Sequence, residues 1–334
     1  MKKLLMPFLL SMCFQNLSLA EEIEKLKVSA HASSPDDYKT RPEKWRFGVD
    51  ISATGNWTVD RKFVGVTDGH YLSLGGKIVG TVGYVIGPHE WITTLGLLET
   101  FSQTPLIDAL IKSADQLNFE SDYYYYLANW YGLFGQLKLD TSIFASSDQR
   151  AAPVTYQVSD ASGAALAPVT ASSFGLTTPF MPLYLQENLG VFFKPFRETA
   201  YTWELYVAAS FRETFANGQK VVTGNSNNVV SIKTLYNFEE IGPMVGTVLS
   251  GEIYDKRVSY KAGIDTMYVL FRFAPYPSSS SFVDHLNTEA FANLSFKLFK
   301  WMSLTWDFKA IRTPEIISDF QIQSNLLLTF NYVL

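Results

Sequence analysis

The sequence predicts an all-β fold, a transmembrane antiparallel up-and-down β-barrel of about 12 strands. Three observations predict it. Apolar and polar residues alternate with a period of two over many segments, which is typical of strands with one apolar and one polar face. After residue 20, no apolar run reaches the roughly 18 residues of a membrane-spanning helix. The connections between segments alternate between short and long, as in a meander closed within a membrane.

The composition is unusual for a soluble protein of 334 residues, a length that would otherwise suggest two or three domains. Aromatic residues make up 15% of the chain and charged residues only 18%, against about 25% charged residues in ordinary soluble domains. The net charge is −5, and no basic stripe is found. The composition therefore excludes a nucleic-acid partner.

Residues 1–20 have the pattern of a cleaved secretory signal peptide. Lys2 and Lys3 precede a short apolar run at 4–14, and Ser18-Leu19-Ala20 is a small-x-small cleavage site. Lipid attachment at Cys13, the chain's one cysteine, is the weaker alternative because the preceding residue is a methionine rather than a small residue. The predicted organisation is a signal peptide at 1–20, a periplasmic tail at 21–44 and the barrel at 45–334.

The alternating segments give the strands in order. They start near Trp45, Tyr71, Trp91, Leu117, Trp130, Leu183, Thr202, Glu239, Val258, Asn287, Trp301 and Phe320. The third and sixth alternate poorly. In the sixth, Glu187 falls among the apolar positions, which predicts a β-bulge there.

Short connections are expected at 87–90, 128–129, 194–200, 254–257 and 299–300. Long ones are expected at 60–70, 102–116, 145–182, 216–238, 273–286 and 312–319. In an outer-membrane barrel the short turns face the periplasm and the long loops face outward. Segment 145–182 reads as a flexible loop, because it is rich in Ala, Ser, Thr and Pro. Thr104-Pro105 followed by 106–112 predicts a short amphipathic helix over the barrel mouth.

Tryptophans support the same arrangement. Trp45, Trp91, Trp130, Trp203 and Trp301, five of seven, fall at strand ends next to a short turn or at the N-terminal entry. Amphipathic rings collect at the boundary between membrane and water, so these five predict a periplasmic girdle. Core tryptophans of a soluble β protein would be scattered along the strands instead.

Two stretches resemble known outer-membrane proteins. The final segment SNLLLTFNYVL resembles the closing strand that the barrel assembly machinery recognises, although it ends in Leu334 rather than an aromatic residue. The stretch from Trp91 to Phe196 resembles a family of bacterial outer-membrane β-barrels classed as a domain of unknown function. The resemblance implies a fold, a Gram-negative outer-membrane location and outer-membrane lipid as a partner. It implies no activity.

A search for catalytic and metal sites gives none. The four histidines are His31, His70, His89 and His285. His70 and Ser73 point to opposite faces of a strand, and Asp284-His285 are adjacent in a loop, so neither pair forms a catalytic arrangement. No histidine or cysteine pair has metal-ligand spacing, and no phosphate-binding glycine loop is found. We therefore expect no enzyme and no cofactor.

The inward face remains as the candidate site. The predicted lumen-lining residues are Asp50, Lys77, Glu120, Asp122, Tyr124, Tyr126, Lys138, Asp140, Glu204, Arg212, Lys261, Asp265, Asp307 and Lys309. Charges of both signs are nearly balanced among them. In one hypothesis these residues line a passive pore for small polar solutes. In the other, their opposite charges pair across the lumen and close it, which gives a non-conducting structural or surface-binding barrel. An outer-membrane enzyme is the weakest of the three hypotheses.

The run of four tyrosines divides between the two faces. Tyr123 and Tyr125 are predicted to face lipid, and Tyr124 and Tyr126 the lumen. If the next strand follows by a tight turn, Tyr123 lies opposite Gly135, and Glu120 lies opposite Lys138 in an ion pair.

Overall fold

The computed structural model describes residue 39 and residues 41–60, 69–104, 107–226, 228–274, 281–299 and 302–330. The predicted signal peptide, most of the tail and the last four residues lie outside these ranges. Within them, most residues belong to strands, and no helix is long and apolar enough to span a bilayer.

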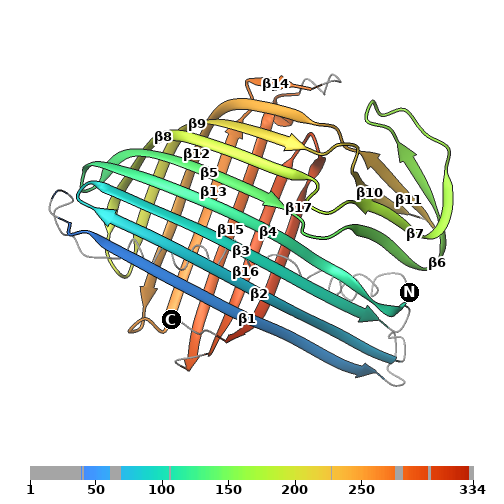
Figure 1. Cartoon of the computed structure of the whole chain (residues 1–334), viewed down its shortest axis with the longest axis horizontal. Helices are drawn as coiled ribbons and strands as arrows, with labels where there is room; N and C mark the ends of the chain where they lie inside the picture. The colour runs from blue at the N-terminus through green and yellow to red at the C-terminus, as the bar shows by residue number, and fades with distance from the viewer. Residues whose placement is uncertain are drawn as a thin grey trace, which may run out of the picture.

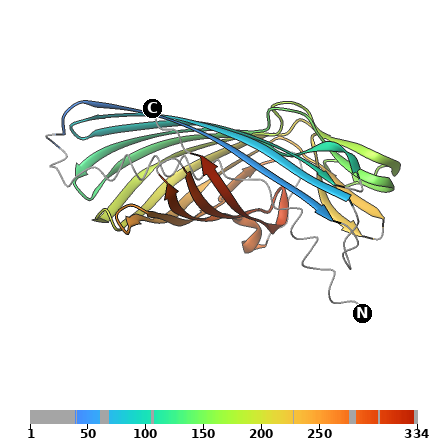
Figure 2. The same ribbon diagram turned by 90° about the horizontal axis from the view of Figure 1, so that it is seen from below.

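The main sheet has 13 antiparallel strands. Twelve form the continuous order β1-β2-β3-β4-β5-β8-β9-β12-β13-β15-β16-β17, and β14 pairs with β12. The sheet curls so that the N-terminal and C-terminal strands meet (Figures 1 and 2), and Cα atoms of β1 and β17 approach within 8 Å. The architecture is an antiparallel β-barrel, as predicted.

The twelve strands correspond one to one with the predicted segments. Their starts differ by at most three residues, except that β4 starts at Ile107, ten residues before the predicted Leu117. Their bounds are β1 Lys44–Asp60, β2 Gly69–Ile86, β3 His89–Thr104, β4 Ile107–Ala128, β5 Tyr131–Thr141, β8 Leu183–Arg197, β9 Thr202–Phe215, β12 Phe238–Ile253, β13 Val258–Tyr268, β15 Leu286–Phe299, β16 Met302–Thr313 and β17 Ile317–Phe330. The strand β14, Phe271–Phe273, continues the path of β13 after a break and is followed by a 3₁₀ helix, η1, at Phe282–His285.

Alternation places opposite kinds of side chain on the two faces. On β2, Leu74 and Ile78 are each 47% exposed, whereas Lys77 and Val79 are 5% and 0% exposed. Large apolar side chains on most of the other described barrel strands follow the same rule. Beside the register shift of β15 against β16, however, Leu298 and Phe299 are both exposed. The exposed apolar face is therefore the outside of the barrel, and the buried mixed face is its interior.

The connections at one end are all short, at 87–88, 129–130, 198–201 and 254–257 among the described residues. We call this the short-turn end. At the other end, which we call the long-connection end, two predicted long loops are wrong. The β3–β4 link spans only 105–106 and the β16–β17 link only 314–316, because these strands continue pairing well beyond the predicted ends.

The predicted helix at 106–112 is also wrong. Ile107 pairs with Thr104, and residues 107–128 form one long strand. The apolar residues of this stretch fit a helical face, but extended pairing with β3 satisfies backbone groups that an isolated helical turn would leave open.

Two long connections fold together into a second sheet, which we call the small sheet. It has the order β10-β11-β6-β7, with β6 at Ser146–Ser159, β7 at Val169–Thr177, β10 at Lys220–Ser226 and β11 at Val229–Thr234. It lies beyond the long-connection end of the barrel (Figure 1). Buried Val154, Tyr156, Val158, Val230 and Ile232 form its core. Segment 145–182 is therefore an ordered part of the small sheet, not a flexible loop.

The bulge predicted at Glu187 is misplaced. Glu187 does point outward and is exposed, but it pairs regularly with Phe211. The register shift of β8 against β9 lies between Phe193 and Phe196. With this shift, β8 pairs with β9 on both sides of residue 194, where the sequence predicts the start of a turn.

Candidate functional site

The interior at the short-turn end holds a cluster of rings, which we call the aromatic layer. It consists of Tyr124, Tyr126, Phe134 and Phe192, all less than 8% exposed. Phe192 meets Tyr124 and Tyr126 edge-on, with ring centroids 5.1 and 5.0 Å apart. Tyr124 also stacks on Phe134 at 6.3 Å. Edge-on and offset contacts at these separations are the favourable geometries for aromatic pairs, so β4, β5 and β8 are held together from inside.

The register of β4 and β5 explains how Tyr124 and Tyr126 reach the interior. Tyr123 lies opposite Gly135, and Glu120 lies opposite Lys138, as predicted. Tyr123 is 44% exposed on the outer face. At the turn itself the register shifts after Tyr126, and Tyr131 pairs with Ala128.

Three cations border the aromatic layer. The ammonium of Lys194 lies 4.4 Å from the centre of the Tyr124 ring, and the guanidinium groups of Arg41 and Arg197 lie 4.5 and 5.3 Å from that of Tyr126. Cations above aromatic faces within about 6 Å are attracted by the ring quadrupole, and more strongly so when desolvated. These contacts place fixed positive charge at the short-turn end of the interior.

Carboxylates accompany these cations. Lys194 Nζ is 3.3 Å from Glu204 Oε2. Glu90 Oε2 accepts a hydrogen bond from the hydroxyl of Tyr126 at 2.9 Å and pairs with Arg41 Nη1 at 3.3 Å. Glu90 and Lys194 are each 1% exposed. At these positions the short-turn end of the interior is closed by packed, mutually compensated side chains.

Further along the barrel lies a second set, the charged inner band, made of Glu120, Lys138, Asp140, Asp265, Glu289 and Lys309. Lys309 Nζ pairs with Glu289 Oε1 at 2.6 Å. Lys138 on β5 is close enough to interact electrostatically with Asp265 and Glu289, which come from β13 and β15. The band therefore joins walls that are several strands apart in the sheet.

The charged inner band is less buried than the aromatic layer. Asp140 is exposed, and the side chains of Glu289 and Lys309 are 35% and 17% exposed. Water thus reaches part of the interior between the long-connection end and the aromatic layer.

An amide network separates the two sets. The side-chain amide of Gln136 donates to Glu120 Oε1 and to Asp122 Oδ1, each at 2.7 Å. Asn188 donates in turn to Gln136 Oε1 at 2.8 Å. Asp122 is 1% exposed, so these bonds replace part of the hydration that its carboxylate loses on burial.

The other predicted lumen residues are distributed along the interior. Lys77 is buried on β2, and the ammonium of Lys261 on β13 lies 5.6 Å from the centre of the Phe291 ring on β15. Asp265 accepts a hydrogen bond from Tyr206, and Asp140 one from Asn118. Arg212 lies near Thr313 at the long-connection end. The side chains of Asp50 and Asp307 fall outside the described part of the structure.

Sequence reasoning missed Arg41, Glu90, Phe134, Phe192 and Lys194. Lys194 was assigned to a turn and Glu90 to another, although each continues the inward parity of its strand. The alternation Asn188, Gly190, Phe192, Lys194 was the available signal. Arg41 precedes the first strand, and nothing in its local sequence indicates that it enters the interior.

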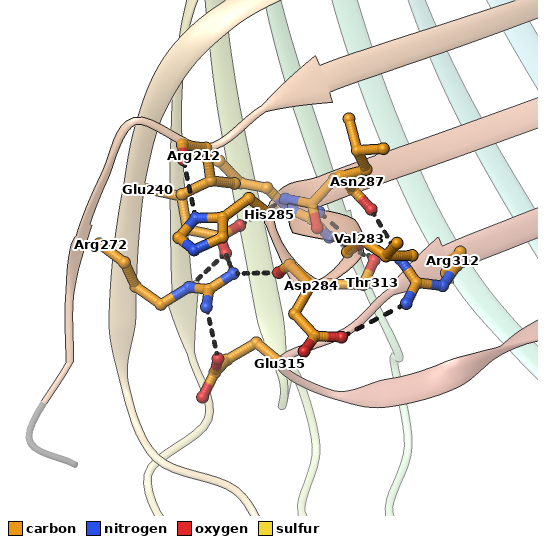
Figure 3. A network of polar contacts seen from close by, with 12 residues as sticks. Arg212, Glu240, Arg272, Val283, Asp284, His285, Asn287, Arg312, Thr313 and Glu315 are labelled. Carbon is orange, nitrogen blue, oxygen red and sulfur yellow. Dashed lines mark hydrogen bonds and ion pairs between the residues drawn. The ribbon is translucent and has the colours of Figure 1, made fainter. Parts of the chain in front are cut away.

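At the long-connection end, Arg272 is the centre of a buried polar network (Figure 3). It pairs with Glu240 Oε1 at 2.8 Å and with Glu315 Oε2 at 3.0 Å. Asn287 donates to the second oxygen of Glu240 at 2.6 Å. Asp284 of the Asp-His pair lies 3.6 Å from Arg312, and His285 Nδ1 lies 3.0 Å from the Val269 carbonyl. These contacts join η1 to β16 and to the segment that follows β13.

The outer face carries the predicted tryptophans. Trp45, Trp91, Trp130 and Trp203 are 38–52% exposed near the short-turn end, and Trp301 lies outside the described residues. Trp91 Nε1 donates to Ser121 and Trp203 Nε1 to Thr247, both at 2.8 Å. Both indole donors thus have partners within the sheet, which an apolar solvent requires. In the described residues, no group of three or more His, Cys, Asp or Glu side chains could hold a metal ion.

Comparison with known proteins adds the following. No family model and no curated protein sequence matches the chain. Among solved structures, an outer-membrane channel from Pseudomonas putida F1 is similar with a TM-score of 0.39 and 12% identity, covering 90% of this chain and 98% of that one. The translocator domain of the autotransporter NalP from Neisseria meningitidis gives 0.36 and 9%, covering 94% and 96%. The β domain of the Bordetella autotransporter BrkA gives 0.35 and 11%, covering 87% and 99%. These scores are low, so the fold assignment depends on the strand order and burial described above.

Proposed function

We propose that the chain is an outer-membrane β-barrel that forms a narrow passage for small polar solutes, closed in this conformation at the aromatic layer. The observation that carries the proposal is the charged inner band, in which partly exposed charges of both signs from β4, β5, β13, β15 and β16 line the interior. A lumen lined by such charges selects and conducts polar solutes without a cofactor.

The outer-membrane location is part of the proposal. The apolar outer face, the tryptophans near the short-turn end and their internally paired indole donors support it. Lipid of this membrane is then the partner of the outer face. We also propose that the barrel assembly machinery recognises the C-terminal strand, and that residues 1–20 direct export. Membership in the family of unknown function remains a prediction from the resemblance.

A non-conducting, surface-binding barrel is the second candidate. The burial of inward side chains at the short-turn end favours it, because an open lumen would leave Phe192 and Lys194 accessible to water. The small sheet would then be the part that meets a partner outside the cell.

Planar-bilayer recording separates the two. Purified folded protein should give small or rare conductance steps, and Tyr124→Ala/Tyr126→Ala should give larger or more frequent ones. The matched control is Tyr123→Ala, which changes the outer face and should leave conductance unchanged. If neither the wild type nor the double variant conducts while both keep the folded form in unboiled detergent gels, the passage is refuted and the non-conducting barrel stands.

A further inference from the structure

Two of the three residues of the β16–β17 turn, 314–316, are buried although the turn closes a hairpin at the rim of the barrel. Glu315 and Ile316 are 7% and 8% exposed, and the preceding Thr313 is 2% exposed. Connections at the ends of strands ordinarily run over the surface, because their backbone groups and charges need water. Burial of a carboxylate in such a turn requires compensating partners.

Three different segments supply those partners. Arg272 of β14 pairs with Glu315 Oε2 at 3.0 Å (Figure 3). The hydroxyl of Tyr236, between β11 and β12, donates to Glu315 Oε1. Lys233 of β11 donates to the backbone carbonyl of Glu315 at 2.5 Å. The turn is thus held by charge-assisted bonds that are stronger than neutral hydrogen bonds.

Apolar contacts reinforce this arrangement. Ile316 is buried in a cluster with Ala216, Leu235 and Phe238. Ala216 lies in the connection before β10, and Leu235 directly follows β11. The turn therefore packs against the ends of these two strands of the small sheet.

The turn also approaches strands that are distant in the barrel. Arg212 of β9 lies 3.4 Å from the hydroxyl of Thr313 on β16. Three strands, β12, β13 and β15, separate β9 from β16 in the sheet. Contacts between such strands cross the interior rather than follow the wall, so the turn lies over the mouth at the long-connection end.

We propose that the β16–β17 turn is a latch that covers the long-connection mouth, and that Lys233 and Tyr236 couple its release to movement of the small sheet. This inference rests on the proposed passage, for which it names the second closed point and its regulation. Displacement of the small sheet by an external ligand withdraws Lys233 and Tyr236 from Glu315 and frees the turn.

The contacts of Glu315 can be weakened while the other contacts of the network remain. Arg272 keeps its two bonds to Glu240 Oε1, from Nε at 2.9 Å and from Nη2 at 2.8 Å, and its bond to the Asp284 carbonyl at 3.2 Å. Glu315→Gln keeps the size of the side chain and removes its charge. It therefore tests the latch while β12, β14 and η1 remain joined.

The test is the rate of thiol labelling at the latch. The full chain is folded in detergent micelles with Cys13, its one cysteine, replaced by serine, and carries Ile316→Cys. A polar maleimide probe should label this position much more slowly than Ser162→Cys, which lies in the exposed β6–β7 connection. Adding Glu315→Gln should speed labelling at 316 about tenfold, the effect of a loss of about 1.4 kcal/mol in closing.

The matched control is Glu187→Gln, an exposed outer-face carboxylate that should leave labelling at 316 unchanged. Tyr236→Phe is the second latch variant and should speed labelling in the same direction as Glu315→Gln. The latch is refuted if residue 316 labels as fast as residue 162, or if both latch variants leave its rate unchanged in protein that keeps the folded gel form. Labelling needs no conductance, so a latch that opens in a barrel that never conducts would refute the passage and keep the latch.

Discussion

The buried ammonium of Lys194 lies 3.3 Å from a carboxylate oxygen of Glu204, inside the barrel and beside the aromatic layer. The Lys194 side chain is fully buried and that of Glu204 is 17% exposed. The pair joins β8 to its neighbour β9. A charge that is removed from water in this way depends on its partner for compensation.

Removing one partner should therefore be more harmful than removing both. We expect Glu204→Gln to lower the free energy of unfolding by about 3 kcal/mol, because Lys194 is left buried without its partner carboxylate. Lys194→Met/Glu204→Gln should be less destabilising than Glu204→Gln alone. Urea unfolding of the detergent-solubilised barrel, followed by tryptophan fluorescence, measures both. The control is Glu252→Gln, which breaks an exposed pair with Lys256 at 3.9 Å and should have an effect below about 0.5 kcal/mol. A double variant that is as destabilised as Glu204→Gln alone, or more so, would contradict this prediction.

Gly190 of β8 permits close approach of β9. A Cβ atom at Gly190 would lie 2.0 Å from the carbonyl oxygen of Val207, a distance that requires the backbone to move. We expect Gly190→Ala to destabilise the barrel by about 1–3 kcal/mol, as overpacking does, and to lower the temperature at which the folded gel form is lost. Gly80→Ala on β2, where a Cβ would meet nothing within 4 Å, is the control and should melt like the wild type. Equal melting of the two variants would show that β8 and β9 separate more readily than their packing indicates.

Leu189 tests which face meets lipid. It is 72% exposed near the middle of β8. If that face lies in a bilayer, Leu189→Arg should cost about 2–4 kcal/mol of folding free energy, measured by reversible unfolding in lipid vesicles. Leu166→Arg, in the exposed β6–β7 connection, should cost much less because water surrounds it. A harmless Leu189→Arg would place that face in water and remove the membrane premise.

Trp91 gives a finer test of the same face. Its indole donates to Ser121 at 2.8 Å across β3 and β4. Ser121→Ala should shift the Trp91 emission only slightly while leaving its quenching by brominated lipid intact, because the ring stays at the membrane boundary. The spectra require a variant in which Trp91 is the one tryptophan retained. Quenching by an aqueous quencher alone would place Trp91 outside the membrane.

The strand number and the facing of side chains could be predicted because period two acts over many residues at once. An error of one residue would have exchanged the two faces of a whole strand. On β2, Leu74 and Ile78 lie outside and Lys77 lies inside, and such an error would have reversed their positions. The tyrosine register followed from the same rule. Strand ends were harder, because pairing between β3 and β4 extends through residues whose own pattern favours a helix.

The aromatic layer and the small sheet depend on tertiary pairing that one sequence does not display. Arg41 enters the interior only because its backbone pairs with Gly87 in the β2–β3 turn. Segment 146–177 is polar and low in strong strand formers at several positions, and it becomes a sheet by pairing with β11. Such partners are distant in sequence and leave no local signal.

The parallel pairing of β6 with β11 has a consequence for how the chain assembles. The two strands belong to different connections, with the β8–β9 hairpin between them. Both connections leave the barrel at the same end only because an even number of strands separates them. We therefore expect the small sheet to form late, after the loop that holds this hairpin has closed. A barrel that gained or lost one strand between these connections could not build it.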